Sequence, residues 1–365
     1  PAVLAVGGEI KATFCVTREH YAYVSQHIGD MGNLETLVAL QRNIEHFQRL
    51  FHVEVSAIAA ELHPGYLSTK WAEELACSLG IPLIGVQHHF AHAASLIAER
   101  GWPIGQPLIA CCFDGTGYGS DGAIWGGEFL VASGRQFERA AQFRYFPLPG
   151  GDASIRKPYR NALAQLWANG IPWDDRLPCV AACQPGERSV LRQQLTRSLH
   201  CVSTSSLGRL FDAVASLIGV RHEVTYEAQA AMELEALAAS VIDTVDRSRY
   251  AFEIKRGSPF EVDCAGLMRR ICDDLNEGVP QRLIAAQFHH AVADMVREVC
   301  EIIRTNTGIK TVGLTGGVFQ NVLLSELVQS RLGENEFDVL THSIVPPNDG
   351  GLSLGQAIVA RSQFT

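Results

Sequence analysis

The sequence predicts an α/β protein built from two lobes with a ligand cleft between them. Both halves of the 365-residue chain open with two strands joined by a glycine-rich turn, and each half continues with strands and helices. Glycine-rich loops follow the ends of several strands, which is where α/β proteins usually place their ligands. At roughly 150 residues per domain, the length suits two domains. We predict them at residues 1–104 and 105–365.

The first lobe is predicted to begin with a hairpin and to continue as alternating helices and strands. Gly7-Gly8 turns the apolar run at 2–6 back into a second strand. Leucine, isoleucine and phenylalanine recur on one helical face across 33–51, and Ser68 is suited to cap the next helix. The expected strands are 2–6, 11–16, 53–59 and 81–86, and the expected helices are 33–51, 68–79 and one that begins near residue 89.

A Gly/Pro linker at 101–106 leads into the second lobe, which opens in the same way as the first. Strand 107–113, a glycine-rich turn at 114–122 and strand 123–133 repeat the hairpin, which indicates an internal duplication. The middle of this lobe is predicted to be mostly helical. The other expected elements are helices at 159–169, 187–199, 206–218, 226–239, 284–306, 320–332 and 352–361, and strands at 311–314 and 337–341.

Charge and composition exclude several classes of protein. The net charge of −9 argues against nucleic acid as the main partner, because phosphate binding needs a basic face. The 10 cysteines are scattered without a CxxC pair, which predicts a reduced, cytoplasmic protein. No apolar run reaches the roughly 18 residues of a membrane span. The chain starts at Pro1 inside a strand-like segment, so we expect a fragment of a longer protein.

A pair of histidines follows the strand at 81–86. His88 and His92 are four residues apart, so on a helix they share one face and could hold one ion. The pair alone is more typical of histidines that bond to backbone or water, because a metal site needs a third ligand and residues that orient the ligands. His89 points about 100° away from His88 on a helix and is expected to be structural.

Three glycine-rich loops could complete a site with these histidines. Such loops present backbone N–H groups to phosphate oxygens at close range. Each one alone fits an ordinary turn, and Asp349 in the last one could equally be a helix N-cap. Together they predict one nucleotide in the cleft, with two imidazoles and one carboxylate suited to Fe(II), Zn or Mn. The loops are 113–119, 315–317 with Asn321 one turn later, and 346–351.

The combined pattern resembles the carboxyl-terminal region of HypF, the family of carbamoyltransferases of NiFe-hydrogenase maturation. That region is similar to the threonylcarbamoyl-transferases of tRNA modification and has a duplicated actin/sugar-kinase/Hsp70-like (ribonuclease H-like) fold. The resemblance covers essentially the whole chain. It rests on His88-x3-His92, FDGTGYG at 113–119, LPGGD at 148–152, GRLFDAV at 208–214, YEAQAAMELE at 226–235, TGGVFQN at 315–321 and PPNDGG at 346–351.

The resemblance implies roles for individual residues. Glu227 departs from the tRNA-modifying relatives, which have a nucleotide-contacting glycine near this position, but a carboxylate there suits ribose hydroxyls. Asp114, Gly115 and Thr116 would be catalytic, with their backbone N–H groups facing a developing oxyanion. The implied ligands are His88, His92 and Asp349 for a divalent metal; Phe113, Asp114, Gly115, Thr116 and Gly117 for the phosphate and acyl end of the nucleotide; Asp212 and Glu227 for ribose; and Gly316, Gly317 and Asn321 for the nucleoside.

The resemblance also implies a reaction. Family members transfer the carbamoyl group of carbamoyl-adenylate to the C-terminal cysteine thiolate of HypE, towards the cyanide ligands of NiFe-hydrogenase. Upstream modules, absent from this chain, make the adenylate from ATP and carbamoyl phosphate. The alternative is a nucleotide-binding and HypE-docking module that is inactive without those modules. A sugar-type kinase is a weaker reading, because the paired histidines argue against it.

Overall fold

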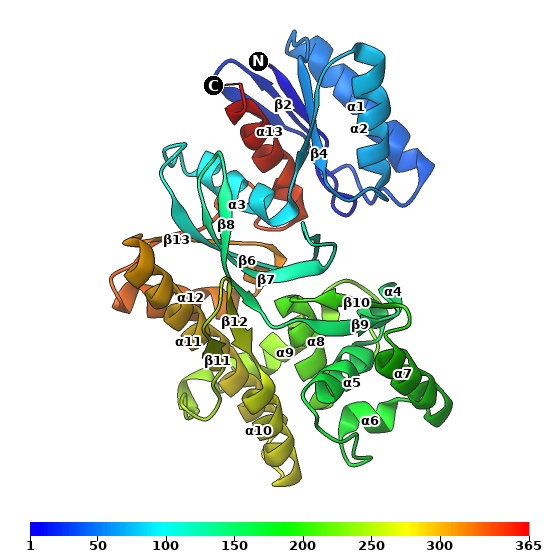
Figure 1. Cartoon of the computed structure of the whole chain (residues 1–365), viewed down its shortest axis with the longest axis vertical. Helices are drawn as coiled ribbons and strands as arrows, with labels where there is room; N and C mark the ends of the chain where they lie inside the picture. The colour runs from blue at the N-terminus through cyan, green and yellow to red at the C-terminus, as the bar shows by residue number, and fades with distance from the viewer. Residues whose placement is uncertain (365) are drawn as a thin grey trace.

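The computed structural model describes residues 1–364 and contains two β-sheets (Figure 1). The first sheet has the strand order β3-β2-β1-β4-β5. The pairs β1–β2 and β2–β3 are antiparallel, whereas the pairs β1–β4 and β4–β5 are parallel. Its strands are β1 (Val3–Ala5), β2 (Cys15–Arg18), β3 (Tyr21–Val24), β4 (Ala57–Glu61) and β5 (Leu83–Val86).

The second sheet repeats this order along the path β8-β7-β6-β13-β14, with the same parallel and antiparallel pairs. The predicted duplication and the two-lobe α/β fold are therefore confirmed, and the repeated order is that of the actin/sugar-kinase-like fold. β11 and β12 extend one edge, and β10 pairs with β7 and β9. The strands are β6 (Leu108–Tyr118), β7 (Ile124–Ala132), β8 (Phe137–Phe143), β9 (Phe146–Pro149), β10 (Cys201–Thr204), β11 (Glu253–Lys255), β12 (Phe260–Asp263), β13 (Thr311–Thr315) and β14 (Asp338–Leu340).

Helices cover both faces of each sheet (Figure 1). No helix among residues 1–364 is both long enough and apolar enough to span a bilayer. The helices are α1 (Leu34–Leu50), α2 (Leu67–Leu79), α3 (His88–Glu99), α4 (Asp152–Arg156), α5 (Pro158–Ala168), α6 (Pro178–Ala182), α7 (Pro185–Arg197), α8 (Leu207–Leu217), α9 (Gln229–Ala239), α10 (Ala265–Asn276), α11 (Gln281–Thr307), α12 (Val322–Glu334) and α13 (Leu352–Ser362).

The strands alternate their side chains between two cores, as the period of two in a pleated strand requires. In β6, Leu108 and Ala110 pack toward α3 and α13, while Ile109 and Cys111 pack toward the helices of the second lobe. The core around α3 and α13 also takes one face of the first sheet, and α1 and α2 cover the other face. The layers are therefore helices, sheet, the α3–α13 pair, sheet and helices.

Helices α3 and α13 are equivalent in the two repeats, because each follows the fifth strand of its sheet. They pack closely: a Cβ on Gly355 of α13 would lie only 1.8 Å from the carbonyl oxygen of Ala91 in α3. The last helix thus packs on first-lobe elements although it comes from the end of the chain. This contact brings the start of α13 to the start of α3, where the site lies.

Some sequence expectations were wrong in detail. The 114–122 segment is not all turn, since β6 continues to Tyr118 with a register shift between Phe113 and Gly117. The middle of the second lobe is mostly helical, as expected, but it also contains the strands β8 to β12, which the sequence did not predict. Several of these strands are only three or four residues long and pair with distant segments, so they leave little periodicity in the sequence.

Candidate metal and nucleotide site

The two histidines lie at the start of α3, just after the half-buried strand β5. Gln87 caps this helix, since its side-chain oxygen accepts a hydrogen bond of 2.9 Å from the backbone N–H of Phe90. His88 and His92 are both buried, and their ring centroids are 4.9 Å apart. The prediction that they share one helical face is confirmed.

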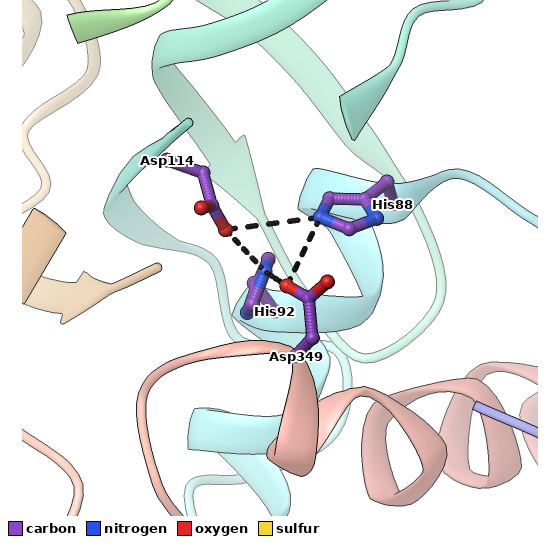
Figure 2. A group of neighbouring side chains, drawn as sticks. All are labelled: His88, His92, Asp114 and Asp349. Atoms are coloured by element: carbon purple, nitrogen blue, oxygen red, sulfur yellow. Dashed lines mark ion pairs between the residues drawn. The ribbon is translucent and has the colours of Figure 1, made fainter. Parts of the chain in front are cut away.

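Two aspartates from the second lobe complete a cluster with these histidines (Figure 2). Asp114 comes from β6, and Asp349 begins the short 3-10 helix Asp349–Gly351 that leads into α13. His92 Nε2 lies 3.0 Å from Asp114 Oδ2 and 3.6 Å from Asp349 Oδ1. His88 Nε2 lies 3.8 Å and 3.7 Å from the same two oxygens. Both aspartates were expected at the site, but Asp114 was assigned only to nucleotide binding and catalysis, not to the metal.

Three of the converging atoms lack hydrogen-bond partners among the described residues, although they are buried. They are Nε2 of His88, Nε2 of His92 and Oδ2 of Asp114. Buried polar atoms normally have a partner, so their convergence indicates a missing one. The four ligand atoms all lie within 4.8 Å of one another. Two imidazoles and two carboxylates suit a borderline divalent cation such as Fe(II), Zn or Mn, so these residues fit the expected metal.

The charges of the cluster support one another. Burial alone would raise the pKa of Asp114, but the contacts with His88 and His92 outweigh it and hold that pKa well below its usual value. Burial alone would lower the pKa of His88, but Glu61, Asp114 and Asp349 outweigh it and raise that pKa. Neighbouring His89 faces no such carboxylate pair. Its burial and the two other imidazoles keep its pKa well below the usual value, which suits a neutral structural residue.

The cluster lies among four glycine-rich segments. The 346–351 segment supplies Asp349 itself, and the other three are the Gly7-Gly8 hairpin and the loops that follow β6 and β13. A Cβ on Gly117 would lie 2.4 Å from His89 Cε1 and 2.5 Å from His88 Cδ2, so no side chain fits there. A Cβ on Gly317 would lie 3.0 Å from Asp114 Oδ1, and one on Gly8 would lie 3.7 Å from Asp349 Oδ2. The Gly7-Gly8 hairpin and the loops of β6 and β13 therefore meet at one place, as a single binding site requires.

The loop at the end of β6 offers its backbone to the site. The Phe113 side chain is fully buried and stacks on Phe319, so only its main chain is available. Gly115 and Thr116 are partly exposed, and the Gly115 N–H bonds Oδ1 of Asp114 at 2.7 Å. This contact fixes Asp114 with Oδ2 toward the histidines.

The residues expected at the nucleoside lie in different surroundings. Asp212 is buried in α8, where its Oδ2 is 2.9 Å from Arg209 Nη1, and burial raises its pKa. Asn321 caps α12 through Leu324 N and donates to His289 Nε2 at 3.1 Å, which leaves one amide N–H and one lone pair. Glu227 is exposed and forms an ion pair with Lys11 of the first lobe.

Two residues of the site were not anticipated from the sequence. Glu61 ends β4 and contacts the first histidine, and Arg209 lies beside Gly115. Two sequence features could have pointed to them. Glu61 is a carboxylate at the end of an apolar strand, and Arg209 lies inside the GRLFDAV motif.

Two family models match the chain. The HypF Kae1-like domain matches residues 1–99, and the second subdomain of the carbamoyltransferase Kae1-like domain matches residues 110–356. Among curated relatives, carbamoyltransferase HypF2 of Cupriavidus necator is 38% identical over 99% of this chain, which spans 46% of that protein. A HypF homolog from the same organism is 35% identical over 100% of this chain and 92% of its own length.

Solved structures give the same result. Full-length HypF in a phosphate- and nucleotide-bound form superposes with a TM-score of 0.91 at 41% identity, over 99% of this chain and 55% of that one. T. kodakarensis HypF gives a TM-score of 0.89 at 32% identity, over 100% of this chain and 48% of that one. The chain thus spans about half the length of most of these relatives. With both family models and a relative of nearly equal length in agreement, the chain belongs to the HypF carbamoyltransferase family.

Proposed function

We propose that this chain transfers the carbamoyl group of carbamoyl-adenylate to the C-terminal cysteine of HypE during hydrogenase maturation. The observation that carries the proposal is the buried cluster of His88, His92, Asp114 and Asp349 among four glycine-rich segments. Family membership supports the carbamoyl group, and the relative solved with phosphate and nucleotide supports a nucleotide as its carrier. The assignment of HypE as acceptor rests on the family context.

A divalent metal would be held by the two Nε2 atoms and by one oxygen from each aspartate. When bound there, such an ion would supply Lewis-acid stabilisation of phosphate oxygens and of the charge on a departing AMP. Asp114 is oriented for this task by the Gly115 N–H, and His88 is oriented by Glu61. Fe(II), Zn and Mn all suit this donor set.

The glycine-rich loops would hold the substrate. The backbone of 113–117 would face the phosphate and acyl end. The Thr116 N–H would stabilise the developing oxyanion, because the Gly115 N–H already donates to Asp114 Oδ1. Gly316, Gly317 and the free hydrogen-bonding capacity of Asn321 would hold the nucleoside. Asp212 and Glu227 would serve the ribose, with Glu227 exchanging its partner Lys11 for the sugar.

The transfer needs no nucleophile from this chain, because the attacking thiolate belongs to the acceptor. Its sulfur forms a C–S bond with the carbamoyl carbon, the bond from that carbon to the phosphate oxygen breaks, and AMP leaves with the electron pair. The thiol proton goes to solvent before the attack. The products are an S-carbamoylated (thiocarbamate) cysteine and AMP.

The test supplies synthetic carbamoyl-adenylate to the metal-loaded chain together with HypE. We expect AMP release and carbamoylation of the C-terminal cysteine, measured by mass spectrometry, and neither with HypE whose terminal cysteine is replaced by serine. The second candidate is a binding module that needs upstream domains, since the chain spans only about half of most relatives. Tight nucleotide binding without transfer would favour that module.

A further inference from the structure

Arg209 lies in the first turn of α8, beside the loop that ends β6. Ser206 caps this helix, and its hydroxyl accepts a hydrogen bond of 3.1 Å from Arg209 N. The same hydroxyl lies 2.7 Å from the carbonyl oxygens of both Asp114 and Gly115. The start of α8 is therefore fixed against this loop, and the position of Arg209 relative to Gly115 is fixed with it.

The guanidinium of Arg209 is buried without the hydrogen bonds that burial normally requires. Only 6% of the residue is exposed. Nε and Nη1 have no hydrogen-bond partner among the described residues, and the contact of Nη1 with Asp212 Oδ2 is an ion pair without hydrogen-bond geometry. Arginine carries five N–H donors, and leaving them unsatisfied away from water is costly. A buried cation in this condition indicates a ligand that supplies acceptors.

The guanidinium of Arg209 lies directly against the loop that carries Asp114. Its Nη2 lies 3.0 Å from where a Cβ on Gly115 would stand, so the absence of a side chain at Gly115 lets the guanidinium come this close to the main chain of the loop. On the other side of the same loop, Asp114 turns its Oδ2 toward His88 and His92. An anion placed over Gly115 would therefore lie between the metal cluster and Arg209.

We propose that Arg209 is a substrate-binding residue whose guanidinium binds a phosphate oxygen of the nucleotide over Gly115. The planar fork of arginine matches a phosphate through two parallel N–H donors, which a lysine cannot reproduce. This inference rests on the proposed function in one respect, namely that the cleft takes a nucleotide.

A purely structural role would make Arg209 the counter-ion of Asp212. Such a partner would be expected to donate hydrogen bonds to the carboxylate, as Arg331 does to Asp294 at 2.9 Å. The Arg209–Asp212 contact lacks that geometry. Asp212 instead limits where the guanidinium can lie, so that its remaining donors stay directed to the loop.

The experiment compares the affinities of AMP and adenosine by calorimetry in the metal-loaded chain. The variants are Arg209→Lys, Arg209→Met, Asp212→Leu and the Arg209→Met/Asp212→Leu double variant. The double variant removes both charges together, which buried ion pairs often tolerate, so it keeps the test valid if Arg209→Met does not fold. Arg331→Met/Asp294→Leu is the matched control, a similar pair between α11 and α12.

We expect the double variant to bind AMP about 10- to 100-fold more weakly relative to adenosine, as the loss of hydrogen bonds to a charged group predicts. Arg209→Lys should show part of this loss. Asp212→Leu should also show part of it, because Asp212 no longer limits where the guanidinium lies. The control pair should leave the ratio of AMP to adenosine affinity unchanged. An unchanged ratio in the double variant, with wild-type protein binding AMP, would overturn the role of Arg209 alone. Failure of the wild type to bind AMP would overturn the proposed function and this inference with it.

Discussion

Glu61 Oε1 lies 2.9 Å from Nδ1 of His88, and both side chains are buried. Metal-bound histidines commonly donate their second ring N–H to a carboxylate, which fixes the tautomer and the ring orientation. With its proton on Nδ1, His88 would present the Nε2 lone pair to a metal held together with Asp114 and Asp349. Glu61 is thus a positioning residue that acts through His88.

Replacing Glu61 should weaken metal binding. Loss of a carboxylate that hydrogen-bonds a metal-bound histidine lowers metal affinity by about 10- to 100-fold. We expect a loss near the lower end of this range for Glu61→Gln and near the upper end for Glu61→Ala. Calorimetric titration of the metal-free chain with Zn²⁺ or Mn²⁺ measures this directly. Glu73→Gln, at an exposed site on α2, is the matched control. Wild-type affinity in Glu61→Ala would remove the positioning role.

Asp114 is expected to be a metal ligand. Asp114→Asn keeps the shape but loses the charge that His88 and His92 face, so its affinity for metal should fall by more than the roughly 10- to 100-fold of an outer partner. The control for the loss of one negative charge is Asp338→Asn, because Asp338 is an exposed residue at the start of β14. Metal content by mass spectrometry after dialysis checks this. If Asp114→Asn retains one ion per chain, Asp114 belongs to the nucleotide loop alone.

Gly117→Ala should disturb the histidines without touching their chemistry. The new methyl group would stand 2.4 Å from His89 Cε1 and 2.5 Å from His88 Cδ2, so the rings or the strand must move. Overpacking of this kind costs about 1–3 kcal/mol of unfolding free energy, and metal affinity should fall with it. Urea denaturation and metal titration measure the two effects.

Gly333→Ala is the control for this substitution. Gly333 lies in α12 with open space around it, and alanine there should stabilise the chain by up to about 1 kcal/mol. Equal unfolding curves for the Gly117 and Gly333 variants would show that β6 can move to accept the methyl group without a loss of stability. Gly117 would then not constrain the histidines.

Glu99 should make the stability of the chain depend on pH. Its carboxylate accepts hydrogen bonds from Ile344 N at 2.7 Å and from His342 Nδ1 at 2.8 Å, which holds the segment leading to Asp349. Burial alone would raise its pKa, but the bonds from Ser343, Ile344 and His342 outweigh it and lower that pKa below 4.5. A depressed folded pKa means that its stabilisation is present above the unfolded pKa and is lost as pH falls through the folded one.

Glu99→Gln should therefore cost about 1.5–3 kcal/mol near pH 7 and less in acid. Urea denaturation of both proteins at pH 7 and at progressively lower pH gives the difference. We expect the difference in the free energy of unfolding between wild type and variant to become smaller as the pH falls below 4.5. A gap that is constant with pH would show that the charge of Glu99 does not matter.

Local features of the site could be predicted from the sequence, whereas features that depend on packing could not. The shared face of His88 and His92 follows from helical spacing alone. The family resemblance implied that Asp349 joins them. The contact of α13 with α3, which brings Asp349 there, was not predicted, because local periodicity carries no signal for it. The direction of Asp114 depends on the Gly115 N–H, and the burial of Glu61 depends on the neighbouring strand β5. Neither of these leaves a local pattern.

The same distinction explains the fold. The long helices α1 and α11 were recognised because their apolar faces repeat over many turns. Strands such as β11 have three residues and are defined by their partners, so the sequence carried little trace of them.

The central claim is that a metal held by the four-residue cluster faces the phosphate of a bound nucleotide. A crystal of this chain grown with Mn²⁺ and AMP, with data collected for anomalous scattering, tests it most directly. The account predicts one anomalous peak within bonding distance of His88, His92, Asp114 and Asp349, with the AMP phosphate beside it over Gly115. An ion bound elsewhere, or AMP bound with its phosphate away from this cluster, would contradict it.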